Sequence, residues 1–551
     1  MFLSEDSKKQ TSKEPMSNRE FGAAIIAIFT GIGALGLWNN QRAIEAWYVY
    51  NFEKVWVSAF LAVATIICAI TYFVSRRSKN VVERIRDLEK VSKKNDESVY
   101  AGRTEDGAKV FVPNSTRTGH VQIIGSTGRG KTHGVIKPWI LRDLASHKDV
   151  VVIDGKGSSE IESELKSLKK NVNRYVFDMM TPDRSIQINP LKHGSVAEIT
   201  DRLFTAFEFK ESEYYRNLQY DTTLLLVTLI KTNIEAVTFK RLYELLTNDE
   251  ELIALANAEP NKLHERRVQD YLKVPQNKRR ETHSGLISQL TPFAVGELSE
   301  ILNGDWYEPF REDVSVSISD LLLGIHESSM FLPIYNEKYP TVMIFNLPTM
   351  KYPMLAAKVG KLIFQEMAWA ISEREKVRRT NFTPVFMDEF SSFVYEGFIN
   401  ILNKARSSGV ALHLSHQSMG DLSQVSDDFA KSLNTNTNVK CILGLNDPDT
   451  ADFFARHIGT RTQKKMTEKM QRKGIFNDFE EMGHASMREA ESYKVHPNTL
   501  KGLGIGNGVL HLPFKEGDSF SEVVNFDAFC SSEMRQKQEE NKSIWEVLIG
   551  Y

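Results

Sequence analysis

The chain has 551 residues, of which 41% are hydrophobic and 25% are charged, and its formal net charge is -2. This length suits about two to four domains, and the balanced charge excludes a protein that binds nucleic acid through a global basic field. The three cysteines, Cys68, Cys441 and Cys530, lack the spacing of a metal or redox site. A disulfide scaffold is therefore excluded, and a reducing compartment is expected for the main domain.

Two uncharged apolar runs lie near the start of the chain, at residues 21–38 and 55–74. Each is long enough to cross about 30 Å of hydrocarbon, and tryptophan and tyrosine gather around the loop between them. Lysine and arginine lie before the first run and after the second. These features predict a membrane anchor over residues 1–80, multi-pass, with both termini cytoplasmic. The alternatives are a signal peptide in place of the first span, and a buried helical pair.

Short apolar runs typical of strands alternate with helical segments from Val121 onward. The expected strands are 121–124, 150–153, 175–177, 342–345, 385–387, 410–414, 440–443 and 509–512, with two more around Asp106 and Gly107. This alternation predicts an α/β fold with a mostly parallel sheet covered on both faces. Residues 206–302 have the pattern of consecutive helices. We therefore expect an all-helical domain at 206–302, inserted in an α/β domain formed by 81–205 and 303–515, with a C-terminal tail at 516–551.

The stretch IIGSTGRGKTHGVIKPWI, residues 123–140, matches the pattern G-x-x-x-x-G-K-S/T between an expected strand and an expected helix. Such a loop points backbone N–H groups at phosphate oxygens, while its lysine reaches the β and γ phosphates and its hydroxyl binds Mg²⁺. The alternative is a glycine-rich turn that matches by chance. The predicted nucleotide-binding residues are Gly125, Ser126, Thr127, Gly128, Arg129, Gly130, Lys131 and Thr132, with Lys131 also catalytic and Thr132 also a metal ligand.

The stretch TPVFMDEF, residues 383–390, ends an apolar strand with two carboxylates. Beside a phosphate-binding loop, Asp388 is expected to hold Mg²⁺, directly or through water, and Glu389 to orient and polarise the attacking water. Gln417 follows the next strand, where it could bond the γ-phosphate or the water and sense hydrolysis. The alternatives are an ordinary strand end with exposed acids for the first pair, and a polar turn residue for Gln417.

The sequence leaves the role of three further features undecided. Arg406 is a candidate for the arginine that completes a neighbouring subunit's site in ring ATPases, or else a solvated arginine at a helix end. The turn at residues 154–157 could line the nucleotide site or a central channel, or be a tight turn only. His413 and His416 are more typical of packing or surface residues than of metal ligands.

These residues together resemble the type IV secretion coupling proteins, the TraD/TraG family of conjugative DNA transfer ATPases. The matching segments are the N-terminal hairpin, GSTGRGKT, VIDGKG, INPL (188–191), the helical insertion, FMDEF, ARSSG, HQS and LKGLGIGNGVL. The resemblance implies a RecA-like P-loop domain with an all-helical domain, assembled as a homo-hexamer around a channel in the bacterial inner membrane. It also implies the use of ATP and Mg²⁺ to move relaxase-bound single-stranded DNA, or protein effectors, to a secretion channel.

The expected function is thus an ATP hydrolase that recruits relaxase–DNA substrate from a relaxosome and pumps single-stranded DNA into a type IV secretion channel during conjugation. The alternatives are a protein-effector coupling ATPase, an FtsK/HerA-like membrane-tethered DNA translocase, and a membrane scaffold with a degenerate ATP site. DNA contacts are expected mainly at phosphates. The local basic stretches are more typical of solvated faces: Lys278, Arg279 and Arg280, and Lys464, Lys465, Lys469, Arg472 and Lys473.

Two departures from the family pattern affect these expectations. Many relatives have Asp-Pro-Lys-Gly where this chain has Asp154, Gly155, Lys156 and Gly157. Several relatives carry a long acidic C-terminal tail, whereas the residues after the last expected strand here are mixed in charge. How cargo is selected is therefore open from the sequence.

Overall fold

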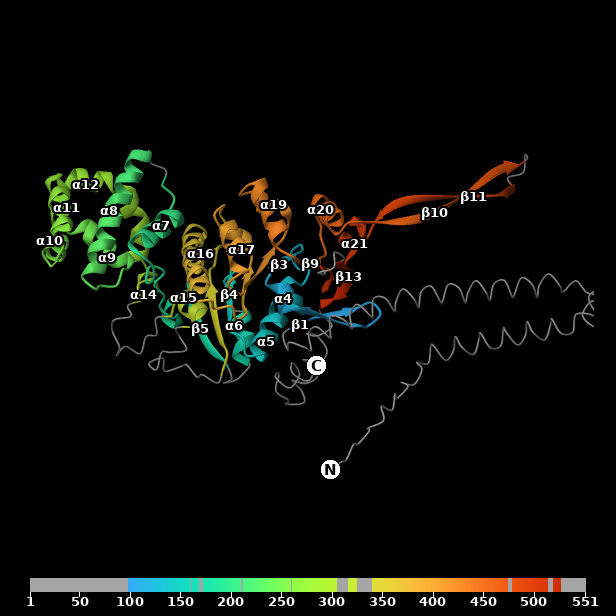
Figure 1. Ribbon diagram of the computed structural model, residues 1–551, viewed down its shortest axis with the longest axis horizontal. Coiled ribbons are helices and arrows are strands. Elements are labelled where there is room, and N and C mark those ends of the chain that lie inside the picture. The colour runs from blue at the N-terminus through green and yellow to red at the C-terminus, as the bar shows by residue number, and fades with distance from the viewer. Residues whose placement is uncertain are drawn as a thin grey trace, which may run out of the picture. The chain divides into compact units, whose positions relative to one another are not determined.

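The computed structural model describes residues 98–158, 160–167, 172–209, 212–258, 260–304, 316–324, 339–473, 478–513 and 519–526 (Figure 1). Within these ranges, no helix combines the length and the apolar character needed to cross a membrane. This finding corrects the expected multi-pass location in the inner membrane. The two expected spans, 21–38 and 55–74, lie outside the described residues, as does most of the expected tail.

Among the described residues, the main sheet has 11 strands and is mixed. Strands from β9 to β5 run parallel, and β12, β13, β1 and β2 extend the sheet antiparallel beyond β9. Each strand expected from the sequence is present. In sheet order the strands are β2 (Lys109–Pro113), β1 (Ser98–Thr104), β13 (Ser519–Asn525), β12 (Asn507–Pro513), β9 (Val439–Leu443), β3 (Val121–Ile124), β8 (Val410–His416), β7 (Thr383–Asp388), β4 (Val150–Asp154), β6 (Thr341–Asn346) and β5 (Asn173–Asp178).

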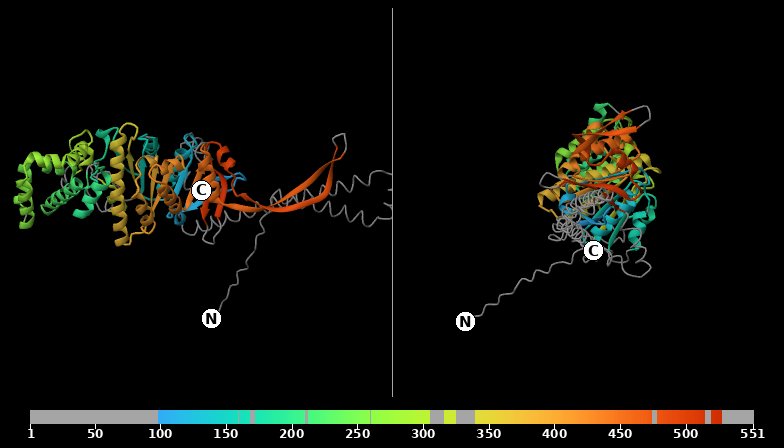
Figure 2. Two further views of the ribbon diagram at one scale, coloured as in Figure 1. Left: turned by 90° about the horizontal axis from the view of Figure 1, so that it is seen from above. Right: turned by 90° about the vertical axis from the view of Figure 1, so that its right-hand side faces the viewer.

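Helices cover both faces of the parallel strands, which explains why β3, β4, β6, β7, β8 and β9 are buried along their whole length. Connections from β3 to β4 and from β7 to β8 move across the sheet in opposite directions. Because parallel crossovers are right-handed, their helices lie on opposite faces. In Figures 1 and 2, α5 (Lys137–Ala145) and α6 (Glu160–Ser167) lie on one face, and α16 (Pro353–Lys376), α17 (Phe398–Ala405) and α19 (Asp427–Asn436) on the other.

The expected run of helices lies between β5 and β6, where the described residues contain no strand. Its apolar side chains, such as Phe239 and Leu290, belong to one continuous core with Phe345 of the sheet. The domain boundaries at 206 and 302 therefore stay a prediction. The helices are α7 (Val196–Ala206), α8 (Glu213–Thr232), α9 (Phe239–Thr247), α10 (Asp249–Asn257), α11 (Lys262–Lys273), α12 (Gln276–Thr282), α13 (Ser284–Ala294) and α14 (Ser299–Leu302), and α15 (Ile318–Leu323) follows before β6.

A separate two-stranded ribbon, β10 (Thr460–Lys473) paired with β11 (Asp478–Tyr493), was not expected from the sequence. It extends away from the helices at its base, α20 (Pro448–Ile458) and α21 (Pro497–Gly502), in Figures 1 and 2. The register places Lys464 opposite Glu489 and Lys473 opposite Asp478. The basic stretch at 464–473 is thus one strand of this ribbon.

Candidate nucleotide site

The glycine-rich loop follows β3 and leads into a single π-helical turn, η1 (Lys131–Ile136), which continues as α5. Gly128 and Gly130 have φ angles of 76° and 95°, in the left-handed region that favours glycine. A side chain at Gly130 would also lie 3.2 Å from the backbone nitrogen of Gly506, which donates a hydrogen bond to the carbonyl of Arg129. The expected strand–loop–helix is therefore present, and the residue before β12 packs against one side of the loop.

Lys131 points back into this loop. Its Nζ is buried and donates a hydrogen bond to the carbonyl oxygen of Gly125 at 2.6 Å. Burial lowers the pKa of Lys131, and the nearby carboxylates of Glu389 and Asp388 oppose that change. The ammonium group thus lies inside the curve of the loop, where a bound phosphate would take over its hydrogen bond.

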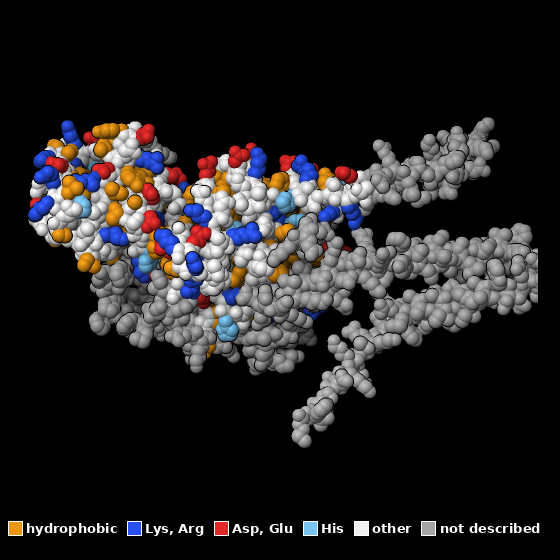
Figure 3. All heavy atoms as spheres, viewed as in Figure 1, with side chains coloured by type: hydrophobic (Ala, Val, Ile, Leu, Met, Phe, Trp, Pro, Cys, Tyr) orange, Lys and Arg blue, Asp and Glu red, His pale blue; other side chains and the backbone are white. Residues whose placement is uncertain are grey.

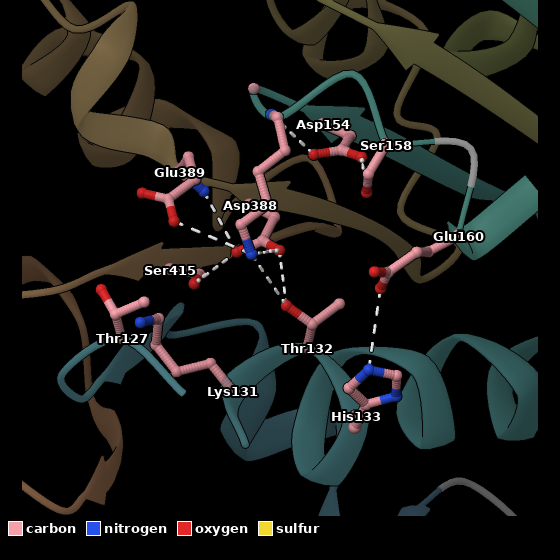
Figure 4. Close-up of polar contacts among 12 residues, drawn as sticks. Thr127, Lys131, Thr132, His133, Asp154, Ser158, Glu160, Asp388, Glu389 and Ser415 are labelled. Atoms are coloured by element: carbon pink, nitrogen blue, oxygen red, sulfur yellow. Dashed lines mark hydrogen bonds and ion pairs between the residues drawn. The ribbon is translucent and has the colours of Figure 1, made fainter. Parts of the chain in front are cut away.

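Asp388, at the carboxyl end of β7, lies directly across from the loop (Figure 4). It is only 1% exposed, and its Oδ2 accepts a hydrogen bond from Thr132 Oγ1 at 2.7 Å while its Oδ1 accepts one from Ser415 Oγ at 2.8 Å. Burial would raise the pKa of Asp388, but Lys156 and the two hydroxyls outweigh burial and lower it. A hydroxyl and an ionised carboxylate side by side are oxygen ligands that Mg²⁺ accepts, so the two predicted metal ligands fit such an ion.

Glu389 and Gln417 form a bridge from the acidic strand to the loop. Gln417 Nε2 donates to both carboxylate oxygens of Glu389 at 3.3 and 3.2 Å, and Gln417 Oε1 accepts from Thr127 Oγ1 at 2.8 Å. Glu389 has a φ of 53°, a conformation that costs a non-glycine residue about 1–3 kcal/mol and is often retained at functional sites. Because β8 lies between β3 and β7, Gln417 reaches both neighbours.

The turn at residues 154–157 also lies at this site. Asp154 and Asp388 are register partners at the ends of β4 and β7, and the N–H of Gly155 donates to the carbonyl of Asp388 at 3.1 Å. Lys156 Nζ lies 3.1 Å from Asp388 Oδ2 and 3.7 Å from Glu389 Oε1. The sequence left the place of this turn open, and the only signal for it was its position at the carboxyl end of a buried parallel strand.

Arg406 is the one predicted site residue that the structure does not bring to the others within this chain. It is exposed and caps the C-terminus of α17, before the amino end of β8, whereas Gln417 follows the carboxyl end of the same strand. Its role toward a neighbouring subunit therefore stays a prediction.

The histidines of β8 are buried packing residues. His413 Nε2 accepts a hydrogen bond from Arg117 Nε at 3.0 Å, and His416 Nε2 lies 2.9 Å from the amide nitrogen of Gln122. In the part of the chain that the structure describes, no group of three or more His, Cys, Asp or Glu side chains could hold a metal ion. Ser415, which supports Asp388 from the same strand, was missed because a serine in a strand carries no distinctive pattern.

Comparison with protein families places the acidic strand and Gln417 in a known segment. The model described as the TraM recognition site of TraD and TraG matches residues 383–500. A curated relative, the type 4 coupling protein DotL of Legionella pneumophila, is 21% identical over 408 residues, covering 65% of this chain and 52% of the relative. The chain therefore spans about half the length of this relative.

Solved structures with the same fold include two forms of a conjugative coupling protein. The unbound monoclinic form of TrwBdeltaN70 has a TM-score of 0.53 and 14% sequence identity, covering 78% of this chain and 89% of that chain. TrwB in complex with ADP and Mg²⁺ has a TM-score of 0.50 and 13% identity, covering 77% and 89%. In its motifs, in its matched segment and in its fold, the chain is similar to the type IV secretion coupling proteins, which confirms the resemblance predicted from the sequence.

Proposed function

We propose that this chain is the ATP-hydrolysing coupling protein of a type IV secretion system. The observation that carries the proposal is the convergence of Thr132, Asp388, Glu389 and Gln417 on one phosphate-binding loop through direct hydrogen bonds. The loop and Lys131 would hold the β and γ phosphates, and Thr132 and Asp388 would hold Mg²⁺. The solved complex of the similar TrwB with ADP and Mg²⁺ supports this choice of cofactor.

The side chains have distinct tasks in this proposal. Mg²⁺, when bound, neutralises charge that develops on the phosphate oxygens. Glu389 orients the attacking water and accepts its proton. Gln417 holds Glu389 and Thr127 at once, so the position of the base follows the position of the loop. Lys131 stabilises the negative charge on the transferred group from inside the loop.

The proposed cargo is relaxase-bound single-stranded DNA, moved through the centre of a homo-hexamer toward the secretion channel. The described surface offers no single-sign basic face in the view of Figure 3, where basic and acidic side chains are interspersed. Of the basic stretch in α12, Arg279 is buried, is paired with Asp249 at 2.6 Å, and lies over the ring of Tyr271. DNA contacts in this proposal therefore belong to a channel between subunits, made mainly to phosphates.

The test is ATP turnover of the full-length chain, compared with the variant Lys131→Ala and with Lys404→Ala, an exposed lysine on α17, as matched control. Loss of the loop ammonium should reduce turnover at least about 100-fold, because it removes a preorganised charge from the transition state. The control should keep wild-type turnover. Equal turnover in wild-type and Lys131→Ala would contradict the proposed enzyme and favour a scaffold with a degenerate site.

Cargo is tested separately by adding single-stranded DNA at several salt concentrations. Stimulation that weakens steeply with salt supports the DNA pump, because phosphate contacts release counterions. Turnover that ignores DNA but rises with a secreted protein would instead support protein-effector coupling.

A further inference from the structure

The ammonium group of Lys156 lies beside the oxygens that we propose as ligands of Mg²⁺. Its Nζ donates to Asp388 Oδ2 at 3.1 Å and to Thr132 Oγ1 at 3.3 Å, and lies 3.7 Å from Glu389 Oε1. Thr132 and Asp388 are the two side chains expected to bind Mg²⁺. One flexible ammonium group therefore contacts the same pair of oxygens that would face the ion.

The charges explain why an ammonium group lies there. Asp388 is 1% exposed and the side chain of Glu389 is 18% exposed, so two nearby carboxylates are partly or fully removed from water. Uncompensated charges in such a place are costly, and a cation between them offsets the cost. Burial alone would lower the pKa of Lys156, but Asp388, Glu389 and Asp154 together raise it.

The backbone of the turn is fixed while the tip of the side chain is able to leave. Lys156 N donates to Asp154 Oδ1 at 2.9 Å, and the next residue, Gly157, has a φ of 61°. In contrast the Lys156 side chain is 41% exposed, so its four-carbon stem has open space beside the site.

An ammonium group and Mg²⁺ exclude each other at these oxygens. Mg²⁺ binds oxygen ligands at about 2.1 Å in a strict octahedral arrangement, so an ion held directly by Thr132 and Asp388 would take up the space beside their oxygens that the ammonium group now fills. Two positive charges a few ångströms apart also repel. Binding of the ion therefore requires release of Lys156 from Asp388 and Thr132.

We propose that Lys156 is a built-in counter-cation that holds the metal position in the nucleotide-free site and competes with Mg²⁺ for Asp388 and Thr132. This inference rests on the proposed function, because it assigns the metal position from the nucleotide site. Lys156 is a positioning residue: it offsets the negative charge of Asp388 before a metal ion binds, and it makes metal binding weak until a nucleotide phosphate supplies further oxygen ligands.

The first test measures binding of Mn²⁺ alone, a paramagnetic stand-in for Mg²⁺, to the nucleotide-free full-length chain by water-proton relaxation. The variants are Lys156→Met, which keeps the length of the side chain without its charge, Lys156→Arg, which keeps the charge, and Lys404→Met as control. Lys156→Met should bind Mn²⁺ about 10-fold or more tightly than wild type, because the competing charge is gone. Lys156→Arg and Lys404→Met should stay close to wild type. Unchanged or weaker Mn²⁺ binding by a folded Lys156→Met variant overturns the inference.

The second test uses the wild-type chain, so it does not depend on the folding of a variant. Lys156 is labelled with an amine-reactive reagent and quantified by mass spectrometry, with Lys404 as internal reference. Addition of Mn²⁺ at saturating concentration should increase labelling of Lys156 relative to Lys404, and unchanged or reduced labelling overturns the inference. Both tests omit nucleotide, so failure of ATP turnover would leave their result intact and would count against the proposed function alone.

Discussion

The Asp388 carboxylate accepts hydrogen bonds from the side chains of Thr132, Lys156 and Ser415 and from the backbone N–H of Glu389. The three side chains come from different parts of the chain, and they lower the pKa of this carboxyl group although burial alone would raise it. An ionised carboxylate held in one orientation is a prepared metal ligand. The groups that hydrogen-bond to this carboxylate therefore affect metal affinity as well as the carboxylate itself.

A substitution at Ser415 tests whether the hydrogen bonds to Asp388 support metal binding. Ser415→Ala removes the hydrogen bond to Asp388 Oδ1, so the carboxylate is less well oriented and its pKa rises. Nucleotide affinity in the presence of Mg²⁺ should fall about 10-fold, whereas affinity measured with a chelator should not change. A fluorescent ADP analogue gives both values, with Ser423→Ala, an exposed serine, as control. An equal loss with and without Mg²⁺ would contradict a role in supporting the metal ligand.

Site residues that belong to a short, local sequence pattern could be predicted from the sequence. Lys131, Thr132, Asp388 and Glu389 each stand at a fixed offset from a strand end, and the structure brings them together as expected. Lys156 could not be assigned, because its contact with Asp388 spans 232 residues and depends on β4 pairing with β7. Spacing along the chain carries no information about that pairing.

Buried histidines form hydrogen bonds in and beside the central strands β3 and β8. His413 and His416 lie in β8, and His120 precedes β3, where its Nε2 lies 2.8 Å from the carbonyl of Leu402 and its Nδ1 accepts from the N–H of Leu412. Buried parallel strands were predictable because short, continuous apolar runs between helices are typical of them. The ribbon β10–β11 was not, because its sequence is mostly polar and lacks the apolar run that marks a buried strand.

These histidines predict how stability depends on pH. Burial lowers the pKa of His120 and of His416 to about 4, from an ordinary value of 6.5, and lowers that of His413 as well. Between pH 6.5 and 4 these histidines are therefore protonated in the unfolded chain but neutral in the folded chain. Their contribution to the free energy of unfolding is complete above pH 6.5 and is lost as the pH falls toward 4. Each histidine contributes up to about 1.4 kcal/mol per pH unit.

The measurement is the urea midpoint of the full-length chain at pH 7, 6 and 5, compared with His120→Asn, which does not titrate. Asp154 acts in the opposite direction, since burial raises its pKa to about 6, so the informative quantity is the difference between the two chains. Wild type should lose more stability between pH 7 and 5 than the variant does. Parallel pH profiles would contradict the assignment of a neutral His120 in the folded state.

At the scale of the whole molecule, one sheet joins the nucleotide site to an antiparallel edge that the sequence did not predict in full. β12 had been expected and β13 had not, and β12 pairs with the last parallel strand, β9, while β13 links it to β1 and β2. Arg406 lies by the amino ends of the parallel strands, away from its own chain's site at their carboxyl ends. An arginine in that place can contact a bound nucleotide only if the nucleotide site of a second copy of the chain lies next to it.

Mixing two inactive variants tests this arrangement. Arg406→Ala should lower turnover about 1000-fold without weakening nucleotide affinity, because the arginine acts on transition-state charge. Lys131→Ala subunits keep Arg406, and Arg406→Ala subunits keep the loop lysine, so mixed assemblies contain interfaces with both groups. Turnover of the mixture should exceed that of either variant alone. A mixture no more active than its components, or full activity in Arg406→Ala, would exclude the role in a neighbouring site.

The hydrogen bond from Gly506 to the carbonyl of Arg129, together with the close contact of Gly506 on Gly130, has a mechanical consequence. Movement of the phosphate-binding loop at Arg129 would stretch this hydrogen bond unless the segment that immediately precedes β12 moved with it. Since β12 is hydrogen-bonded on both sides, to β9 and to β13, that displacement is passed to the outer strands rather than absorbed in a loose loop. We therefore expect nucleotide binding at the loop to affect the outer strands of the sheet through these backbone hydrogen bonds.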